Sequence, residues 1–357
     1  MKLSDYVIEY ISRYSKRVFV VVGGGAMHLN DSLCKMEYTC MMHEQGAALA
    51  AQAYGHVTNQ LGVCMVTTGP GGTNAVTGCL AAWMDSTPVL FISGQVQTSQ
   101  AMGTSGVRYK GAQEADIVSI VSPITKYAIT VADASQIRCV LGAAIHAATT
   151  GRKGPVWVDI PLDIQSADID PRELQAFTIP FNEWEEWQKT ENIRLGVEAT
   201  KKAIDGASKP VILAGHGIIS SNATKSFYEL LDRLKCPVLL TWKSIYLLSD
   251  KHPLYCGRPG TIGQRAANWI QQNSDFLLVL GAKMDYDQTA YQLAGVAPGA
   301  RKIVVDIDPA ELAKYDGWTK VNADVKDFID ALKIDGEYGT WLKECKQMNK
   351  DNPIIDR

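Results

Sequence analysis

The sequence lacks the features that usually mark metal-binding, disulfide-rich and membrane proteins. Its eight cysteines form no Cys-x-x-Cys pair and stand at no zinc-ligand spacing with histidine, so we expect reduced core thiols and no metal site. The apolar run at 18–22 is far too short to span a membrane. Residues 1–17 mix acids with bases and space their apolar side chains as a helix does, which predicts an amphipathic first helix and not a targeting peptide. Together these absences predict a cytoplasmic protein.

The chain also lacks an excess of either charge. It has 35 Lys and Arg against 38 Asp and Glu, and the two signs are mixed throughout a formal net charge of −3. Nucleic-acid binding is not predicted, because there is no basic patch, and no long charged run marks a tail. At 357 residues the chain is too long for one ordinary core and suits two domains.

Apolar runs alternate with helical stretches in two successive segments. Such alternation predicts an α/β protein in which parallel sheets are covered by helices on both faces. We expect two doubly wound parallel-sheet domains, the second one Rossmann-like. The predicted boundaries are a first domain at 1–170, a linker at 171–188, a second domain at 189–335 and a polar linker at 336–357.

One carboxylate, Glu44, stands between an apolar run and a stretch of Ala and Gly. We predict a strand at 39–42, an exit turn at 43–46 and a helix of small residues at 47–55. Ligands of open parallel sheets bind beyond the carboxyl ends of the strands, where this turn falls. An apolar setting would raise the pKa of Glu44 and suit it to acid–base work. The alternative is that Glu44 opens the helix, stabilised by the helix dipole and exposed to solvent.

Three loops rich in glycine or polar residues follow apolar runs. The loop TTGPGGTN (67–74) permits close backbone approach and leads into a helix start with free N–H groups. It is neither a Walker A loop nor GxGxxG, so a phosphate site and a tight strand–helix turn both remain open. VVGGGAMH (21–28) has the same two readings. Residues 92–116 predict a functional loop, because long structureless loops are otherwise uncommon.

These motifs carry a family resemblance. HEQGAA, TTGPGGTN, MDSTPVLFISGQV, QEADIV, PITKYA and GPVWVDIPLD occur in this order and spacing, and KPVILAGHG, PLYCGRPGTIG, LLVLGAK and VVDIDPAEL follow. The sequence closely resembles the acetolactate-synthase group of thiamine-diphosphate enzymes over essentially its whole length. The resemblance identifies the two predicted domains as the N-terminal pyrimidine-binding domain and the central domain. Within the group, the chain is similar to the acetolactate-synthase-like proteins of surface-polysaccharide gene clusters.

The resemblance implies a role for four residues near the first strands. The glutamate at the position of Glu44 is the catalytic residue of the family. It hydrogen-bonds N1′ of the cofactor's aminopyrimidine, so that the 4′-nitrogen can take the proton from C2 of the thiazolium ring. Thr67, Pro70 and Asn74 are implied to line the pyrimidine pocket.

Three further residues are implied to lie at the cofactor. Gln113 would reach it from the polar loop, and Gln95 and His43 would lie in contact with it or one layer behind. His43 could equally be a loop histidine that is satisfied by the backbone. The sequence leaves these two readings of His43 open.

The implied activity is decarboxylation of a 2-keto acid, normally pyruvate, with carboligation to a carbonyl acceptor. Acyl transfer to a keto-sugar in surface-polysaccharide synthesis and simple 2-keto acid decarboxylation are alternatives within the family. The alternative from another class is a nucleotide-binding regulatory module, since doubly wound domains serve many functions.

Three positions depart from the family pattern. Gly23-Gly24-Gly25 replaces Pro-Gly-Gly, Ala112 replaces an aromatic residue, and the loop between Gln95 and Gln113 is longer. Ala112 would enlarge the acceptor side and favour an acceptor bulkier than pyruvate. The stretches GRPGT (257–261) and GAKMDYDQ (281–288) match only loosely those that hold FAD in acetolactate synthases, so FAD remains open.

The GDG motif of the family is missing from these 357 residues. In the family this motif and a later Asn bind Mg²⁺ and the diphosphate. We therefore expect Mg²⁺ to be held by a C-terminal diphosphate-binding domain beyond residue 357, with the chain either truncated or half of a split enzyme. The family's cofactor lies between subunits, which implies a homodimer or tetramer.

Overall fold

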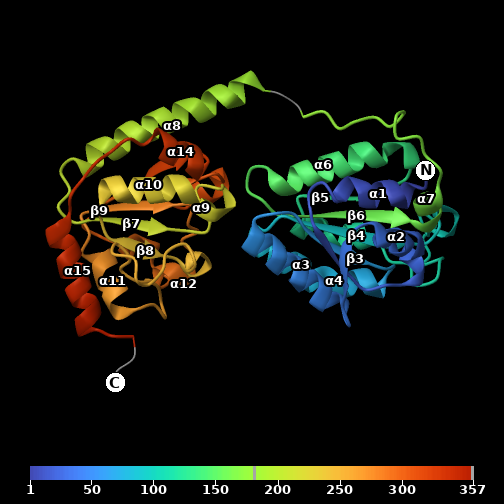
Figure 1. The fold of residues 1–357 in the computed structure, drawn as a ribbon, viewed down its shortest axis with the longest axis horizontal. Coiled ribbons are helices and arrows are strands. Elements are labelled where there is room, and N and C mark those ends of the chain that lie inside the picture. The colour runs from blue at the N-terminus through green and yellow to red at the C-terminus, as the bar shows by residue number, and fades with distance from the viewer. Residues whose placement is uncertain (180–181, 355–357) are drawn as a thin grey trace. The chain divides into compact units, whose positions relative to one another are not determined.

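The apolar runs of the sequence form buried parallel strands. The structure is a computed structural model that describes residues 1–179 and 182–354. Its contacts divide the chain into two compact units, Met1–Pro180 and Phe181–Arg357. Each unit is built around one all-parallel sheet with helices on both faces, which confirms the predicted α/β class (Figure 1).

The first unit has a six-stranded sheet of order β2-β1-β3-β4-β6-β5. Its strands are β1 (Arg17–Val20), β2 (Glu37–Cys40), β3 (Gly62–Val66), β4 (Val89–Gln95), β5 (Tyr127–Thr130) and β6 (Pro155–Pro161). Its helices include α1 (Leu3–Ile11), α2 (Met27–Ser32), α3 (Glu44–Thr58), α4 (Pro70–Met84), α5 (Ile117–Val121), α6 (Ile137–Thr149) and α7 (Leu162–Ser166).

Two apolar cores lie on opposite faces of this sheet. One joins the sheet to α1, α2 and α6, and the other joins it to α3, α4 and α5. Helices α3 and α4 consist largely of small residues and lie close together, because Gly78 on α4 leaves no room for a side chain against Ala48 on α3. The small residues of the sequence therefore allow two helices to approach closely below one face of the sheet (Figure 1).

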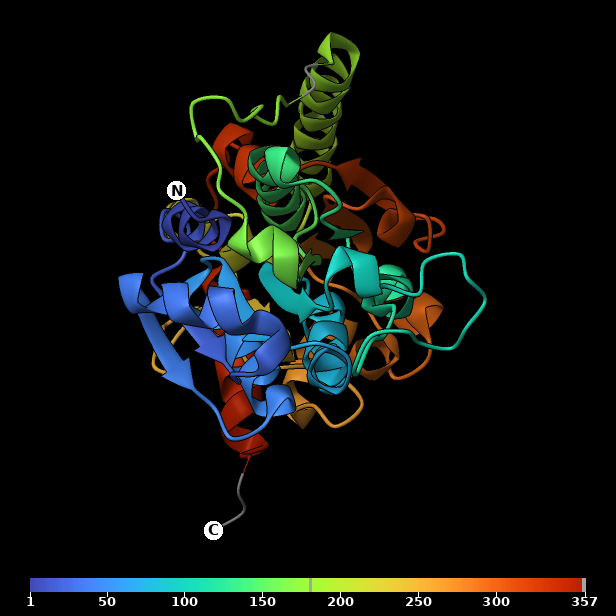
Figure 2. The ribbon, with the colours of Figure 1, turned by 90° about the vertical axis from the view of Figure 1, so that its right-hand side faces the viewer.

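The strand order places a topological switch between β1 and β3. The chain leaves β1 toward β2 on one side, and it leaves β3 toward β4 on the other. Ligands of open α/β sheets bind at the carboxyl end of such a switch, where the two loops diverge. Figure 2 views the first unit from this carboxyl edge, with the loop that follows β4 extending outward in teal.

The second unit has a five-stranded sheet of order β11-β10-β9-β7-β8. Its strands are β7 (Pro210–Ala214), β8 (Val238–Leu240), β9 (Phe276–Leu280), β10 (Arg301–Asp306) and β11 (Thr319–Asn322). Its helices include α8 (Glu183–Ile204), α9 (Gly217–Ser220), α10 (Thr224–Leu234), α11 (Arg265–Gln272), α12 (Tyr286–Thr289), α13 (Pro309–Leu312), α14 (Val325–Ala331) and α15 (Gly339–Asp351). Among the described residues, no helix has both the length and the apolar character needed to cross a bilayer.

The structure differs from the expected linkers in two places. Helix α8 begins at Glu183, within the predicted linker 171–188, because Asn182 caps it by accepting hydrogen bonds from the second and third helical N–H groups. The predicted linker 336–357 contains α15, whose Trp341 and Cys345 are buried in the core of the second unit. The sequence of α15 looks polar because only one narrow stripe of the helix faces that core.

Candidate active site

Glu44 lies at the carboxyl edge of the first sheet, as the first residue of α3. Its Oε2 accepts a hydrogen bond of 3.0 Å from Nδ2 of Asn74, which lies on α4. Its Oε1 faces Gly71, where an added Cβ would lie 3.6 Å away. The side chain is half-buried, so it is less enclosed than the sequence suggested. The hydrogen bond from Asn74 fixes Oε2 of Glu44. Oε1 lies at the N-terminal ends of the two adjacent helices α3 and α4.

The strand before Glu44 ends earlier than predicted, and helix α3 begins at Glu44, within the predicted exit turn 43–46. Strand β2 stops at Cys40, whereas we expected a strand at 39–42, and the side chain of Met42 is fully exposed. His43 is the N-cap of α3, and its Nδ1 accepts a 3.1 Å hydrogen bond from the backbone N–H of Gln45. This contact matches the reading of His43 as a histidine satisfied by the backbone, and Glu44 does open the helix.

The two glycine-containing loops meet at the switch between β1 and β3. The backbone N–H of Gly25 donates a 3.1 Å hydrogen bond to Oγ1 of Thr67. Added Cβ atoms at Gly23 and Gly25 would lie 2.6 Å from Thr67 and 1.7 Å from Thr68. Glycines are therefore needed here for close packing between the loops, which is the tight-turn reading of VVGGGAMH.

Pro70 opens α4 directly after Gly69, which has a φ of +57°. A Cβ on Gly69 would lie 1.8 Å from the backbone carbonyl oxygen of Gln113, so only glycine fits against that residue. Gln113 itself has a φ of +60° and an exposed side chain. The polar loop thus returns to the site, and the structure brings Gln113 beside the turn that carries Thr67 and Pro70.

The polar loop is held by Glu114, the neighbour of Gln113. Its carboxylate accepts hydrogen bonds from the backbone N–H groups of Met102, Lys110 and Gly111 at 2.5, 2.8 and 3.1 Å. Burial acts to raise the pKa of Glu114, but these three backbone donors outweigh it and hold the pKa below its ordinary value. The ionised carboxylate therefore gathers distant parts of the loop around one point.

Gln95 lies at the end of β4 and is 7% exposed. Its Nε2 donates to the carbonyl oxygen of Ala115 at 2.9 Å and to Oδ2 of Asp159 at 3.1 Å. Its Oε1 accepts from the backbone N–H of Val96 at 3.0 Å. Both polar atoms of the Gln95 side chain are thus bonded within the protein.

Asp159, on β6, is a functional candidate that the sequence reading missed. It is 1% exposed and also accepts hydrogen bonds from Ser93 at 2.6 Å and Thr130 at 3.1 Å. Burial raises the pKa of Asp159 to about 6, against the hydrogen bonds from Ser93, Gln95 and Thr130, which lower it. The available signal was a single acid inside the apolar run GPVWVDIP, since a buried acid needs several donors around it.

The two stretches considered for FAD bond to each other in the second unit. The backbone N–H and Oγ1 of Thr261 both donate to the carbonyl oxygen of Asp287, at 2.7 and 3.0 Å. Nε2 of Gln288 donates to the carbonyl oxygen of Pro259 at 2.9 Å. These donors and acceptors are thus bonded within the protein.

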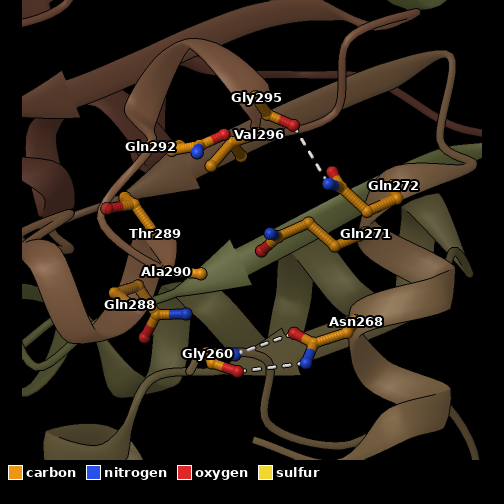
Figure 3. A pocket seen from close by; sticks show the side chains of 10 residues that line it. All are labelled: Gly260, Asn268, Gln271, Gln272, Gln288, Thr289, Ala290, Gln292, Gly295 and Val296. Atoms are coloured by element: carbon orange, nitrogen blue, oxygen red, sulfur yellow. Dashed lines mark hydrogen bonds between the residues drawn. The ribbon is translucent and has the colours of Figure 1, made fainter. Parts of the chain in front are cut away.

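A pocket of about 290 Å³ lies between α11 and the loop after α12 (Figure 3). Asn268 exchanges two hydrogen bonds with Gly260, at 2.9 and 3.0 Å, and Gln272 donates to the carbonyl oxygen of Gly295 at 3.0 Å. Gln271 points into the pocket (Figure 3), and its buried Oε1 has no hydrogen-bond partner. The lining contains amides and apolar groups but no ionisable side chain, so it offers no acid–base chemistry.

Among residues 1–179 and 182–354, acidic, histidine and cysteine side chains do not gather into a metal centre. Within the part of the chain that the structure describes, no group of three or more such residues could hold a metal ion. The candidate active site is therefore the carboxyl edge of the first sheet, around Glu44 and Asn74.

Two family models match the chain. Residues 1–120 match the thiamine pyrophosphate enzyme, N-terminal TPP binding domain, and residues 197–332 match the thiamine pyrophosphate enzyme, central domain. The first match covers β1 to β4 with Glu44, and the second covers the sheet of the second unit. The site described above thus lies in the domain that the first model describes as TPP-binding.

Curated relatives agree with these matches. The acetolactate synthase isozyme 2 large subunit of Escherichia coli is 34% identical over 340 residues, which are 94% of this chain and 59% of that protein. The probable acetolactate synthase large subunit of Methanocaldococcus jannaschii is 34% identical over 376 residues, covering 100% of this chain and 61% of that protein. An acetolactate synthase of Mycobacterium leprae is 38% identical over 300 residues, 83% of this chain and 46% of that protein. The chain thus spans about half to three-fifths of the length of these relatives. The matches to both domain models and to these relatives show that the chain belongs to the thiamine pyrophosphate enzymes, within the acetolactate synthase group.

Proposed function

We propose that this protein decarboxylates a 2-keto acid, pyruvate in the first place, with thiamine diphosphate, and joins the remaining fragment to a carbonyl acceptor. The observation that carries the proposal is the pairing of Glu44 with Asn74 at the carboxyl edge of the sheet. A solvent-facing helix cap would need no such partner on a neighbouring helix. Bound thiamine diphosphate supplies the chemistry, because its thiazolium ring accepts the electrons released when carbon dioxide leaves.

Glu44 is proposed as the catalytic residue that shares a proton with the pyrimidine ring. Asn74 holds Oε2 of Glu44 at 3.0 Å, which fixes the plane of the carboxylate. Oε1 then remains as the atom that holds or releases the proton, and Gly71 leaves the space beside it open. General acid–base catalysis requires a positioned group of this kind.

Thr67, Pro70 and Asn74 are proposed to line the pyrimidine pocket, and Gln113 is proposed to reach the cofactor from the polar loop. Oγ1 of Thr67 also accepts a hydrogen bond from the backbone N–H of Gly25, so Thr67 connects the loops that follow β1 and β3. The backbone of Gln113 packs directly on Gly69, next to Pro70. His43 and Gln95 support the pocket from behind, because their side chains bond to backbone groups and to Asp159.

The remaining assignments follow from the family. Residues 1–170 are taken as the pyrimidine-binding domain and 189–335 as the central domain, in a cytoplasmic protein. Mg²⁺ and the diphosphate are proposed to be held by a domain outside residues 1–357. No step of the proposed reaction uses FAD.

A homodimer or tetramer is proposed for the complete protein. The outer face of α4 exposes Leu80, Trp83 and Met84, at 41, 41 and 66%, which is consistent with a covered interface. Light scattering of the full-length protein at several concentrations tests this assignment.

Ala112 favours a second candidate, with a keto-sugar as the acceptor. Ala112 stands where the family has an aromatic side chain, and it is exposed beside Gln113. The smaller side chain leaves more room for an acceptor. Product analysis with pyruvate alone and then with added keto-sugars distinguishes acetolactate formation, simple decarboxylation and acyl transfer.

The test of the proposal is Glu44→Gln in the full-length protein, with thiamine diphosphate and Mg²⁺ added. We expect carbon dioxide release from pyruvate to fall by a factor of about 10² to 10⁴, the usual contribution of a positioned acid–base group. The matched control is Glu37→Gln, which changes an exposed glutamate on β2 of the same unit and should leave the rate unchanged.

A Glu44→Gln protein with wild-type activity would overturn the catalytic assignment. Failure of the unaltered protein to bind thiamine diphosphate, measured by calorimetry, would instead favour the nucleotide-binding regulatory module.

A further inference from the structure

The loop between β4 and α5, residues 96–116, is tethered at three points. At its start, Thr98 donates its N–H and its hydroxyl to the carboxylate of Asp163, at 2.9 and 2.5 Å. In its interior, Glu114 gathers three backbone N–H groups. At its base, the side chain of Gln95 bonds both Val96 and Ala115. A loop of this length therefore has a defined path.

The tether at the base joins the two ends of the loop. Oε1 of Gln95 accepts from the first loop residue, Val96, and Nε2 donates to Ala115 near the last. Packing supports the same closure, because a Cβ on Gly111 would lie 2.6 Å from the side chain of Val96. One glutamine side chain thus sets how the loop returns to the sheet.

Asp159 fixes the orientation of that glutamine. Its Oδ2 accepts from Nε2 of Gln95 at 3.1 Å, and its Oδ1 accepts from Ser93 at 2.6 Å. Ser93 in turn accepts from Nε1 of Trp157 at 2.8 Å, and the Trp157 ring stacks on Phe91 with centroids 4.9 Å apart. The carboxylate is therefore held by a fully buried part of the sheet.

The position of Gln113 depends on this arrangement. It lies directly before Glu114 and two residues before Ala115, so both tethered residues follow it immediately in the chain. Its carbonyl oxygen packs on Gly69, at the turn that leads to Pro70. A shift of Ala115 would therefore move Gln113 relative to that turn.

We propose that Gln95 and Asp159 form a positioning pair, which places Gln113 at the cofactor site by fixing the return of the loop at Ala115. The inference rests on the proposed function for the role of Gln113, but the tether itself does not. Gln95 acts in this arrangement through the loop and without touching the cofactor. Asp159 thereby influences the position of Gln113 through two hydrogen bonds, one from Gln95 to Asp159 and one from Gln95 to Ala115.

Thr130 distinguishes positioning from simple core stability. Thr130 donates to the same Oδ2 of Asp159 at 3.1 Å, but it comes from β5 and lies outside the loop. Removing its hydroxyl weakens the buried cluster while the bonds of Gln95 remain. Thr130→Val is therefore the matched control for Gln95→Met, which keeps the length of the side chain but removes both polar atoms.

The experiment measures amide hydrogen exchange of both variants in the 357-residue chain without cofactor. Gln95→Met removes the charge-assisted hydrogen bond from Gln95 to Asp159 and so releases the base of the loop. We expect the amides of Met102, Lys110 and Gly111 to exchange at least about tenfold faster, which is the factor that the loss of one such bond predicts. The amides of α3 and α4 should exchange at the wild-type rate. Thr130→Val should leave the loop amides unchanged.

A second readout uses the full-length protein. We expect Gln95→Met to raise the half-saturating concentration of thiamine diphosphate about tenfold, on the same energetic basis, while the KM for pyruvate stays constant.

Unchanged loop exchange in Gln95→Met would overturn the inference, and so would equal acceleration in Thr130→Val. Faster loop exchange with an unchanged half-saturating concentration would also overturn it, because Gln113 would then not depend on the tether. An active Glu44→Gln protein would refute the proposed function alone, since the exchange result does not depend on catalysis.

Discussion

Two carboxylates at the carboxyl edge of the first sheet have different surroundings. Glu44 is half-buried and has one side-chain partner, Asn74, on a neighbouring helix. Asp159 is almost fully buried and accepts from Ser93, Gln95 and Thr130. A carboxylate with one free oxygen can exchange a proton with a ligand, whereas a carboxylate surrounded by donors holds other groups in place. The two residues therefore suit catalysis and positioning respectively.

The raised pKa of Asp159 predicts how stability depends on pH. The pKa is 3.8 in the unfolded chain and about 6 in the folded one, so the native state binds the proton more tightly. Between these values stability falls as pH rises, because ionising the buried carboxyl costs free energy. Above the folded pKa this cost is about 3 kcal/mol, from roughly two pKa units.

Asp159→Asn removes this titration. The difference in unfolding free energy between Asp159→Asn and the wild type should shift by about 2 kcal/mol in favour of the variant from pH 4 to pH 7, because a small part of the cost is already present at pH 4. Urea unfolding at both pH values measures this difference in free energy. Asp163→Asn is the control, because the pKa of Asp163 is lowered, and its difference from the wild type should shift in the opposite direction. A pH-independent difference for Asp159→Asn would contradict the assigned burial effect.

At the scale of elements, the crossing of α3 and α4 places Glu44 beside Asn74. Gly78 makes the approach of the two helices possible, since an added Cβ would lie 2.4 Å from Cβ of Ala48 and 2.8 Å from its carbonyl carbon. The neighbouring atoms belong to backbone and to a short side chain, which cannot swing away. The spacing of the catalytic pair is thus set by a glycine on the same face of α4, one helical turn beyond Asn74.

Gly78→Ala should therefore destabilise the first unit by about 1–3 kcal/mol, as overpacking of a close contact does. Gly46→Ala is the matched control on α3, because its nearest neighbour is the flexible end of Met41 at 3.7 Å. Helix propensity favours alanine there, so Gly46→Ala should gain up to about 1 kcal/mol. Denaturant unfolding measures both, and equal effects of the two substitutions would refute the packing argument.

Wholly buried strands, the edge strand β8 (Val238–Leu240) among them, could be read from the sequence, whereas the more exposed edge strands β2, β5 and β11 could not be placed correctly. Strands β3, β4, β6, β7 and β9 are buried along their whole length, so each appears as a continuous apolar run. The edge strands β5 and β11 were missed, and β2 was placed two residues late. All three are largely exposed on one side and carry mixed sequences such as TKVN. Their position in the sheet depends on pairing with a neighbouring strand, and a local sequence pattern contains no information on that pairing.

At the scale of the whole molecule, the sequence was a better guide to which residues lie together than to the role of each residue. Parallel strands bring their exit loops to one edge, so Glu44, Thr67 and Asn74 could be expected together. The hydrogen bonds of Gln95 to Val96, Ala115 and Asp159 could not, because they depend on side-chain orientation and on partners up to 64 residues away. Contacts of that range are fixed only when the whole sheet has formed.

The division into two units predicts separate unfolding of two groups of thiols. All eight cysteines are free, and Cys34 and Cys40 are exposed. Among the buried thiols, Cys64 and Cys79 lie in the first unit and Cys236, Cys256 and Cys345 in the second. An alkylating reagent should modify Cys34 and Cys40 quickly in the native protein and the buried thiols only after unfolding, since burial blocks access to them.

Mass spectrometry of protein alkylated at increasing urea concentrations reads the two units independently. Gly78→Ala should lower the urea midpoint for Cys64 and Cys79 by an amount that matches its loss of free energy. The midpoint for Cys236, Cys256 and Cys345 should not move, because the units have separate cores. A common midpoint for all five buried thiols, shifted as one by Gly78→Ala, would mean that the two units unfold as a single cooperative structure.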